Sequence, residues 1–397
     1  MLDENGAVWW APQPLIDALH ARDWQRLMVA LRPLWAHSRL LPVGHALLEK
    51  LVAPRKPITA HLLCLPTDGT QALPGCADMP ALCDAALARQ PLLQAAALAA
   101  LLAFGAAQAD TGKLVLTGGV SSITGSAGGG ITPWAVIGTQ ATEGELGFSA
   151  YGTRAGTQDY ALSSYGAAIG WQDRVELSLA RQDFDAAPAF ALNGIAPFGV
   201  APGQHIKMDV LGLKVKLLGD AILDADTWVP QVALGLEHKQ VRPGSLQSVL
   251  DFLGTKTSGT DLYLSATKLL LDKSLLLNTT LRYTNANQNG LLGFGSAAPG
   301  KNSRSLQPEF SIAYLLRHNL AVGAEYRFKP NNLQALGAAA GLGAALREDD
   351  WKDVFVAWAP SKNVSLTLAW VDLGRIVPGV TRDKRQTGYY LSAQVAF

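Results

Sequence analysis

The chain has 397 residues, a formal net charge of +1 and charged side chains at 16% of its positions. The near-zero net charge argues against nucleic acid as a partner, because phosphate binding requires an excess of clustered basic residues. The mean hydropathy of +0.14 is high for a soluble protein. No apolar run after Phe104 is long enough to span a bilayer as a helix. The apolar residues are therefore dispersed, as they are in the alternating strands of a membrane barrel.

Residues 1–88 are predicted to form a small helical, soluble segment. Short amphipathic stretches end at prolines, as His45–Leu51 does before Pro54. The segment holds all three cysteines, but the Cys and His spacings match no zinc site, so we predict no metal or cofactor. Its centre, VGHALLEKLVAPRKPITAHLL (Val43–Leu63), resembles the C-terminal part of an uncharacterised bacterial cytoplasmic family, domain of unknown function 3025. We interpret the segment as a fused or misassigned N-terminal extension.

A signal-peptide-like segment follows at residues 89–109. A basic residue precedes the uncharged, Leu- and Ala-rich run Pro91–Phe104, and the small-x-small exit is formed by Ala107 and Ala109. These three parts predict cleavage after Ala109, so that the mature chain begins at Asp110. The alternative is a buried, Ala-rich helix of a soluble domain. An export signal normally begins a chain, so this position supports a separate origin for the residues before it.

From Lys113 onward, apolar and polar residues alternate with a period of two. In Leu320–Lys329, one face carries aliphatic and aromatic side chains, whereas the other carries Gly, Glu, Arg and Lys. Leu275–Asn285 alternates in the same way. Many runs last ten or more residues, which suits a tilted membrane strand better than a soluble one. A soluble periplasmic β-sandwich would also alternate and remains the less favoured alternative.

The connections between these runs alternate between short and long from Trp171 to the C-terminus. Tight turns such as Arg317–Asn319 and Ser361–Asn363 are separated by long connections such as Ala286–Arg304 and Pro330–Asp350. Outer-membrane barrels have short periplasmic turns and long outer loops. We therefore predict an all-β fold over residues 110–397, an antiparallel transmembrane β-barrel.

Strand counting predicts 12–14 strands. Eleven follow Asp159, another is expected at Glu145–Gly152, and weaker candidates lie at Lys113–Leu116 and Pro133–Gln140. The Gly-rich stretch between the weak candidates lacks the Lys-Ser/Thr of a nucleotide-binding loop, so we expect a hairpin loop or a segment tucked into the lumen. The alternation slips near Leu211–Gly212, which predicts a bulge or a glycine kink.

The last strand, Thr387–Phe397, carries the predicted barrel-assembly signal. Tyr389, Leu391, Val395 and the terminal Phe397 fall on one face. A terminal aromatic residue after alternating apolar residues resembles the C-terminal signal that the barrel-assembly machinery reads. Tyr and Trp residues near many strand ends agree with an interfacial girdle.

Residues 111–134 and 348–374 resemble a second uncharacterised family, the Gram-negative outer-membrane proteins of domain of unknown function 3034. The second stretch reads EDDWKDVFVAWAPSKNVSLTLAWVDLG. The resemblance covers essentially residues 110–397 and implies the outer-membrane location and the fold. It brings no known activity, so no functional residue is carried over. The predicted partners are outer-membrane lipid, lipopolysaccharide and the barrel-assembly machinery.

We predict no enzymatic activity and no catalytic residue. The exported part has three histidines, His205, His238 and His318, and it lacks a Gly-x-Ser-x-Gly motif. The acidic run Glu348–Asp350 together with Asp353 could bind calcium, although such a run more often forms a solvated loop edge.

Charged residues on the strands are predicted to face the lumen, because a charge on the lipid face costs about 2–4 kcal/mol at the bilayer midplane. The candidates are Lys207, Asp209, Lys214, Lys216, Arg282, Glu325, Arg327 and Lys329. Mixed charge either lines a weakly selective pore or cross-links a packed interior. The loops at 241–255 and 333–346 are apolar enough to form short inward-folding helices or an entrance for a hydrophobic ligand.

Two hypotheses for the function follow from this pattern. The leading one is a passive channel or uptake porin for a small solute, which could be an apolar molecule. The alternative is a plugged structural or ligand-displaying barrel without transport.

Overall fold

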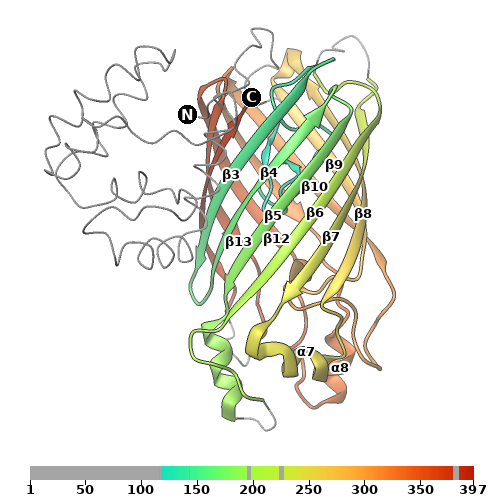
Figure 1. Cartoon of the computed structure of the whole chain (residues 1–397), viewed down its shortest axis with the longest axis vertical. Coiled ribbons are helices and arrows are strands. Elements are labelled where there is room, and N and C mark those ends of the chain that lie inside the picture. Colours follow the sequence, from blue (N-terminus) through green and yellow to red (C-terminus); the bar gives the residue numbers. More distant parts are fainter. Residues whose placement is uncertain (1–115, 117, 143, 195–197, 223–227, 379–383) are drawn as a thin grey trace, which may run out of the picture. The chain divides into compact units, whose positions relative to one another are not determined.

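The computed structural model describes residues 116, 118–142, 144–194, 198–222, 228–378 and 384–397. Within these residues, twelve antiparallel strands close into a barrel, in which each strand pairs with its neighbour in sequence and the last pairs with the first (Figure 1). The strands are β3 (Leu146–Thr157), β4 (Ala161–Trp171), β5 (Val175–Asp185), β6 (His205–Leu218), β7 (Gln231–Arg242), β8 (Ser258–Leu270), β9 (Leu275–Thr284), β10 (Ser305–Arg317), β11 (Leu320–Arg327), β12 (Trp351–Ser361), β13 (Val364–Asp372) and β14 (Thr387–Ala396). The predicted antiparallel barrel is confirmed at the lower strand number, whereas a β-sandwich is excluded.

The segments predicted over residues 1–88 and 89–109, together with Ala107, Ala109 and Asp110, lie outside the described residues. Their assignment as a soluble extension, a signal and a cleavage site therefore stays a prediction.

The outer wall of the barrel is apolar over much of its height. Outward positions on neighbouring strands carry exposed leucines, among them Leu177 and Leu179 on β5 and Leu211 and Leu213 on β6. Such a continuous exposed apolar surface would drive a soluble protein to aggregate, whereas hydrocarbon requires it. Among the described residues, no helix is long and apolar enough to cross a bilayer. The closed barrel with its apolar wall fits a bacterial outer membrane.

The two ends of the barrel differ in the length of their connections. One end carries tight turns, such as residues 318–319 and 362–363, and the C-terminus (Figure 1). The other end carries most of the long loops with their short helices: η1 (Ala187–Gly194), η2 (Gly244–Leu246), α7 (Gln247–Leu253), η4 (Gln288–Gly290) and α8 (Gln334–Ala339). The tight-turn end is the periplasmic one in outer-membrane barrels. Leu250 and Leu253 of α7 are buried, which confirms a short inward-facing helix in this loop.

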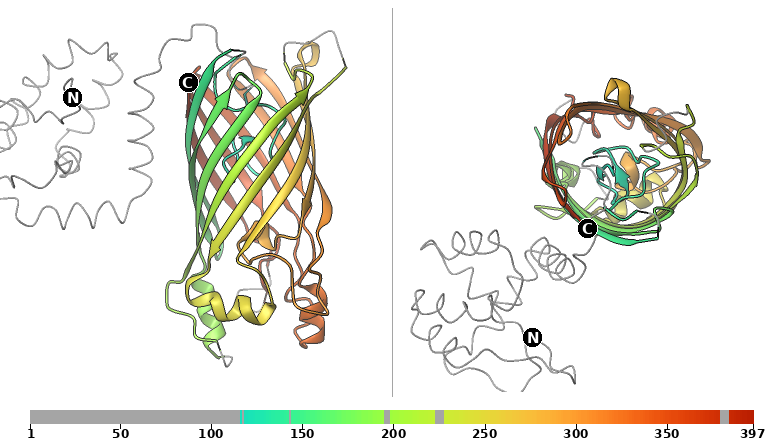
Figure 2. Two further views of the ribbon diagram at one scale, coloured as in Figure 1. Left: turned by 45° about the vertical axis from the view of Figure 1, so that its right-hand side comes forward. Right: turned by 90° about the horizontal axis from the view of Figure 1, so that it is seen from above.

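Residues 118–142 lie inside the barrel, and we call them the plug. The view along the barrel axis shows this stretch, in teal, within the ring of strands (Figure 2). It contains the short hairpin β1 (Val120–Ser121) and β2 (Ala127–Gly128), and nearly all of its side chains are buried. The predicted segment in the lumen is thus confirmed. The weak strand candidate Pro133–Gln140 is wrong, because its backbone binds side chains of the wall instead of a neighbouring strand.

The predicted bulge near Leu211–Gly212 is also wrong. The ladder between β5 and β6 runs without interruption through both residues, and the irregularity lies between Lys216 and Leu218. A Cβ at Gly212 would overlap the hydroxyl of Ser178 on β5. This glycine therefore allows close packing between inward-facing side chains and does not mark a break in the strand.

Candidate functional site

One ion pair of the wall holds the plug hairpin. Glu176 on β5 accepts hydrogen bonds from the backbone N–H groups of Ala127 (3.1 Å) and Gly138 (2.7 Å). Lys214 on β6 donates from Nζ to the carbonyl oxygens of Ala127 (2.9 Å) and Val136 (3.0 Å). The two charges are 3.1 Å apart and buried. Charged side chains of the wall thus bind backbone groups of the plug.

Strand β11 holds the next turn of the plug in the same manner. Glu325 accepts hydrogen bonds from the backbone N–H of Ile131 (2.8 Å) and from the hydroxyls of Thr132 and Ser311. Arg327, two residues further along β11, donates to the carbonyl oxygen of Ile131 (3.0 Å). The plug is therefore bound by opposite charges on both of its faces.

Neutral side chains of the wall complete these contacts. Gln182 donates to the carbonyl oxygen of Ile123 (2.7 Å), Thr280 donates to that of Pro133 (2.8 Å), Thr267 accepts from Ala135 N (2.8 Å), and Gln231 donates to Ala135 O (2.8 Å). Buried backbone groups require such partners, because each unpaired group would cost about 1–3 kcal/mol. The lumen wall is in effect a binding surface for the main chain of the plug.

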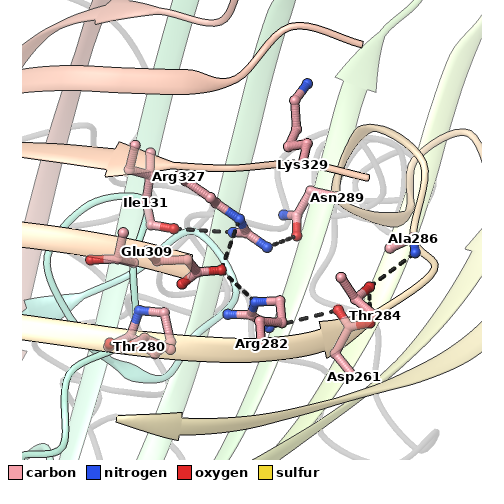
Figure 3. Close-up of polar contacts among 12 residues, drawn as sticks. Ile131, Asp261, Thr280, Arg282, Thr284, Ala286, Asn289, Glu309, Arg327 and Lys329 are labelled. Carbon is pink, nitrogen blue, oxygen red and sulfur yellow. Dashed lines mark hydrogen bonds and ion pairs between the residues drawn. The ribbon is translucent and has the colours of Figure 1, made fainter. Parts of the chain in front are cut away.

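A fully buried ionic network lies beside the plug, across β7 to β11 (Figure 3). Arg282 is at its centre: its Nε lies 2.6 Å from Glu309, and its NH1 lies 2.8 Å from Glu237. Arg327 lies 3.2 Å from the same Glu309 oxygen and also contacts Asn289. Lys239 and Asp261 add a pair at 2.7 Å. Removing one partner of such a pair leaves a buried charge uncompensated, at a cost of about 3–5 kcal/mol.

A separate ion pair lies beyond the end of β11, among the long loops. Lys329 Nζ is 3.5 Å from Glu348 and donates to the side chain of Gln288 at 2.8 Å. Glu348 accepts a hydrogen bond from the backbone N–H of Gln288 (2.9 Å). Burial lowers the pKa of Lys329 to about 8, and burial raises the pKa of Glu348. The pair ties two long loops together at this end of the lumen.

Most of the predicted lumen-facing charges lie inside. Lys214, Arg282, Glu325 and Arg327 face the lumen and are buried, and Lys329 is buried just beyond β11. Lys216 is partly buried at the tight-turn end of β6, where it pairs with Asp173 (2.9 Å) and Asp220 (3.5 Å).

The prediction is wrong for Lys207 and Asp209. They share the outward face of β6 with Leu211 and Leu213, and Asp209 pairs there with Arg181 (2.5 Å) and Arg242 (2.6 Å). Both lie close to the long-loop end of β6, outside the apolar band. The desolvation cost that drives charge inward falls to about 0–1 kcal/mol near the interface.

Several inward-facing acids were not among the predicted lumen residues, namely Glu176, Glu237, Glu309 and Asp353. Strand parity could have identified them. Glu176, for example, alternates with Leu177 and Leu179 and shares its face with polar Ser178 and Gln182.

The acidic run at 348–350 forms no calcium site with Asp353. Glu348 pairs with Lys329, Asp349 with Arg375 (3.1 Å), and Asp353 points into the lumen. Within the described ranges, no three His, Cys, Asp or Glu side chains are grouped to hold a metal ion.

A small apolar pocket with space of about 30 Å³ lies between part of the plug and the wall. It is lined by Leu116, Gly119, Val120, Gly129 and Trp134 on the plug side and by Leu269, Leu276, Ala313, Leu315, Ala321, Phe355 and Ala357 on β8 to β12. These wall residues belong to the tight-turn half of their strands. A lumen wall is usually polar, so an apolar lining here is a distinguishing feature.

Residues 117–394 match the model of a family described as "Protein of unknown function (DUF3034)". The chain belongs to this family. Residues 1–104 separately match the model of another family of unknown function, DUF3025. No curated protein matches the chain in sequence.

Solved outer-membrane barrels resemble the DUF3034 chain at low identity. The KdgM porin in complex with disordered oligogalacturonate is 10% identical, with 63% of this chain and 99% of that chain covered and a TM-score of 0.37. The NanC porin is 10% identical, with 62% and 98% covered and a TM-score of 0.39. Outer membrane phospholipase A from Escherichia coli is 10% identical, with 63% and 92% covered and a TM-score of 0.33.

Proposed function

We propose that this DUF3034 barrel is an outer-membrane uptake protein for a small apolar solute and that the plug closes it in the resting state. The observation that carries the proposal is the way the plug is held. Glu176 with Lys214 on one wall and Glu325 with Arg327 on the other bind its backbone. A filled lumen of this kind is not an open diffusion pore.

The chemistry of these contacts supports a closure that can be reversed. Each neutral hydrogen bond between the plug and the wall contributes a net stability of about 0.5–1.5 kcal/mol, and each one to a charged side chain about 1.5–3 kcal/mol, because water can replace either partner. Apolar packing would fill a lumen at no greater cost than buried charge, since hydrophobic replacements of buried ion pairs are often neutral or stabilising. Charged side chains aimed at backbone groups therefore favour a segment that binds and leaves over a permanent filling.

Two apolar regions favour an apolar solute. The first is the pocket between Trp134 of the plug and Phe355 and Leu276 of the wall. The second is a cluster at the long-loop end, where Phe184, Met208, Val241, Leu250 and Phe294 pack together. With the plug in place the space in the first pocket is only about 30 Å³, below the roughly 300–1,000 Å³ of sites for small ligands, so a solute would use these surfaces after the plug moves. An apolar molecule would find such surface on both sides of the ionic network.

The second candidate function is a barrel that stays plugged and serves a structural or ligand-displaying role. The buried pairs around Arg282 favour it, because they fix the wall rigidly. An enzymatic role has less support. His205 and His238, which a serine hydrolase would need beside a serine, lie against Asp183 (2.6 Å) and Thr260 (2.9 Å) on the outer wall.

A pair of engineered disulfides tests the proposal. The hydroxyls of Thr132 in the plug and Ser311 in the wall are in contact, so Thr132→Cys with Ser311→Cys should tie the plug to β10. The matched control ties two wall strands, through Thr153→Cys with Ser392→Cys, whose hydroxyls lie 2.7 Å apart. Both pairs are made in a chain whose three natural cysteines are changed to serine. The readouts are single-channel conductance in planar bilayers and naphthalene uptake by expressing cells.

We expect the unmodified barrel to be closed for most of the recording, with discrete openings. Oxidation of the plug–wall pair should abolish the openings and the naphthalene uptake, reduction should restore both, and the wall–wall pair should change neither. Openings that persist in the oxidised plug–wall variant would show that plug movement is not the gate. Absence of any opening and of any uptake in every variant would favour the permanently plugged barrel.

A further inference from the structure

Charge balance inside the barrel singles out two acids. The described part of the chain has eight buried acids, and six have a Lys or Arg within 4 Å: Glu176, Glu237, Asp261, Glu309, Glu348 and Asp372. Glu325 and Asp353 have no such cation among the described residues. Two buried carboxyl groups are thus left without a counter-charge at the point where β11 holds the plug.

These two carboxyl groups face each other. Glu325 on β11 and Asp353 on β12 are directly paired across the antiparallel ladder, and both point into the lumen. Directly opposite side chains have Cβ atoms about 4.5–5.5 Å apart. Glu325 accepts hydrogen bonds from Ile131 and Thr132 of the plug. Neither carboxyl oxygen of Asp353 has a hydrogen-bond partner in the described structure.

A third group completes the site. The side chain of Tyr390, which reaches over from β14, is buried, and its hydroxyl also lacks a hydrogen-bond partner among the described residues. It lies against Gly130 of the plug, so the three side chains converge where the plug passes β11.

Among the residues that the structure describes, the other elements packed around the site supply no unpaired positive charge. Strand β10 presents Ser311, which bonds to Glu325, and β13 presents Val371, which is paired with Asp353. On the same face of β11, Arg327 is engaged by Glu309 (3.2 Å), by Asn289 (2.8 Å) and by the plug.

A proton fits this site better than a metal ion does. Two ionised carboxylates in contact repel each other strongly when they are buried, so such pairs commonly hold one proton between them. A calcium ion would require six to eight oxygen ligands. The site is too tightly packed for that, because a Cβ at Gly129 would overlap Glu325 and one at Gly130 would overlap Tyr390.

We propose that Glu325 and Asp353 share a single proton and that this proton latches the plug. The protonated Asp353 donates its O–H to Glu325, whose ionised oxygens hold the N–H of Ile131 and the hydroxyl of Thr132. Loss of the proton places two negative charges side by side, which forces Glu325 away from the plug. The latch acts on the plug whether or not the barrel transports a solute.

Thiol accessibility inside the plug tests the latch. Ser126 lies in the plug and is buried, and Ser126→Cys in a chain without the three natural cysteines provides one reactive thiol. Its alkylation rate in detergent micelles is measured with Asp353 intact and with Asp353→Asn. The amide keeps the shape of the carboxylic acid and a hydrogen-bond donor for Glu325, but it cannot ionise. Both proteins contain the same thiol, so the ratio of their alkylation rates cancels the pH dependence of that thiol's own ionisation.

We expect this ratio to be close to one at about pH 6 and to rise at least about fivefold by about pH 9.5, because only Asp353 can lose the shared proton. A flat ratio would overturn the proposal. Tyr390→Phe distinguishes a proton from a metal ion, and it should leave the alkaline rise unchanged. If calcium suppressed the alkaline labelling and Tyr390→Phe abolished that effect, the site would bind a cation and the shared proton would be ruled out.

Discussion

Burial lowers the pKa of Lys329 to about 8, although Glu348 lies 3.5 Å from its ammonium group. In the unfolded chain this pKa returns to its ordinary value of about 10.4. Between these two values the unfolded state binds more protons than the folded state. The contribution of Lys329 to the free energy of unfolding therefore increases as the pH rises through this window.

The corresponding prediction compares the unmodified protein with Lys329→Met. The free energy of unfolding of the unmodified barrel should increase relative to that of the variant between about pH 7 and about pH 9.5. Only the lysine can lose a proton in this range, and the loss removes the free-energy cost of its buried charge. Urea unfolding in detergent at both pH values provides the measurement, and the difference between the two proteins cancels groups that titrate in both. An equal difference at both pH values would contradict the lowered pKa.

At the scale of single elements, close packing between strands depends on glycines of the inner face. Gly235 on β7 is paired with Tyr263 on β8, and a Cβ at this glycine would overlap the tyrosine ring. The guanidinium group of Arg282 lies 5.1 Å from the centre of that ring, so a displaced ring would disturb the buried ionic network.

We expect Gly235→Ala to destabilise the barrel by about 1–3 kcal/mol, the usual cost of overpacking a filled interior. Gly156→Ala on β3 is the matched control, because nothing lies within 4 Å of a Cβ at that position. The temperature at which the folded, fast-migrating band is lost in gel electrophoresis measures the effect. Equal temperatures for the two variants would show that Tyr263 accommodates the extra methyl group.

The strands themselves could be predicted from the sequence, because a two-residue period and loop lengths are local properties. The inward face of a charged residue could be predicted only within the apolar band of the outer wall, where contact with hydrocarbon excludes charge. Lys207 lies beyond that band, on the outer wall. The charge pair of Glu176 and Lys214 brings together residues of different strands to hold a third segment. The positions of these residues along the chain do not indicate that they come together. Tyr389 and Leu391 are exposed on one face of β14, and their role in assembly stays a prediction.

At the scale of the whole molecule, the barrel and the plug are parts of one continuous chain, so the way the chain begins decides whether the plug has a free end. Cleavage after Ala109 would leave residues 110–117 ahead of the plug. A short free end lets the plug withdraw from the lumen by moving along its own length, without dragging the residues that precede it. An uncleaved extension would instead keep residues 1–109 attached to the plug and oppose its withdrawal.

We therefore expect the protein extracted from outer membranes to begin at Asp110, as determined by N-terminal sequencing and intact mass. Ala107→Leu with Ala109→Leu should block cleavage, because signal peptidase requires small residues at both positions. The uncleaved form should then show fewer openings in planar bilayers than the processed one, since its plug is anchored. Recovery of the native protein with residues 1–88 attached would overturn the predicted cleavage. Equal opening frequencies in the two forms would show that cleavage does not affect plug movement. The closed state would then depend only on the contacts between the plug and the wall.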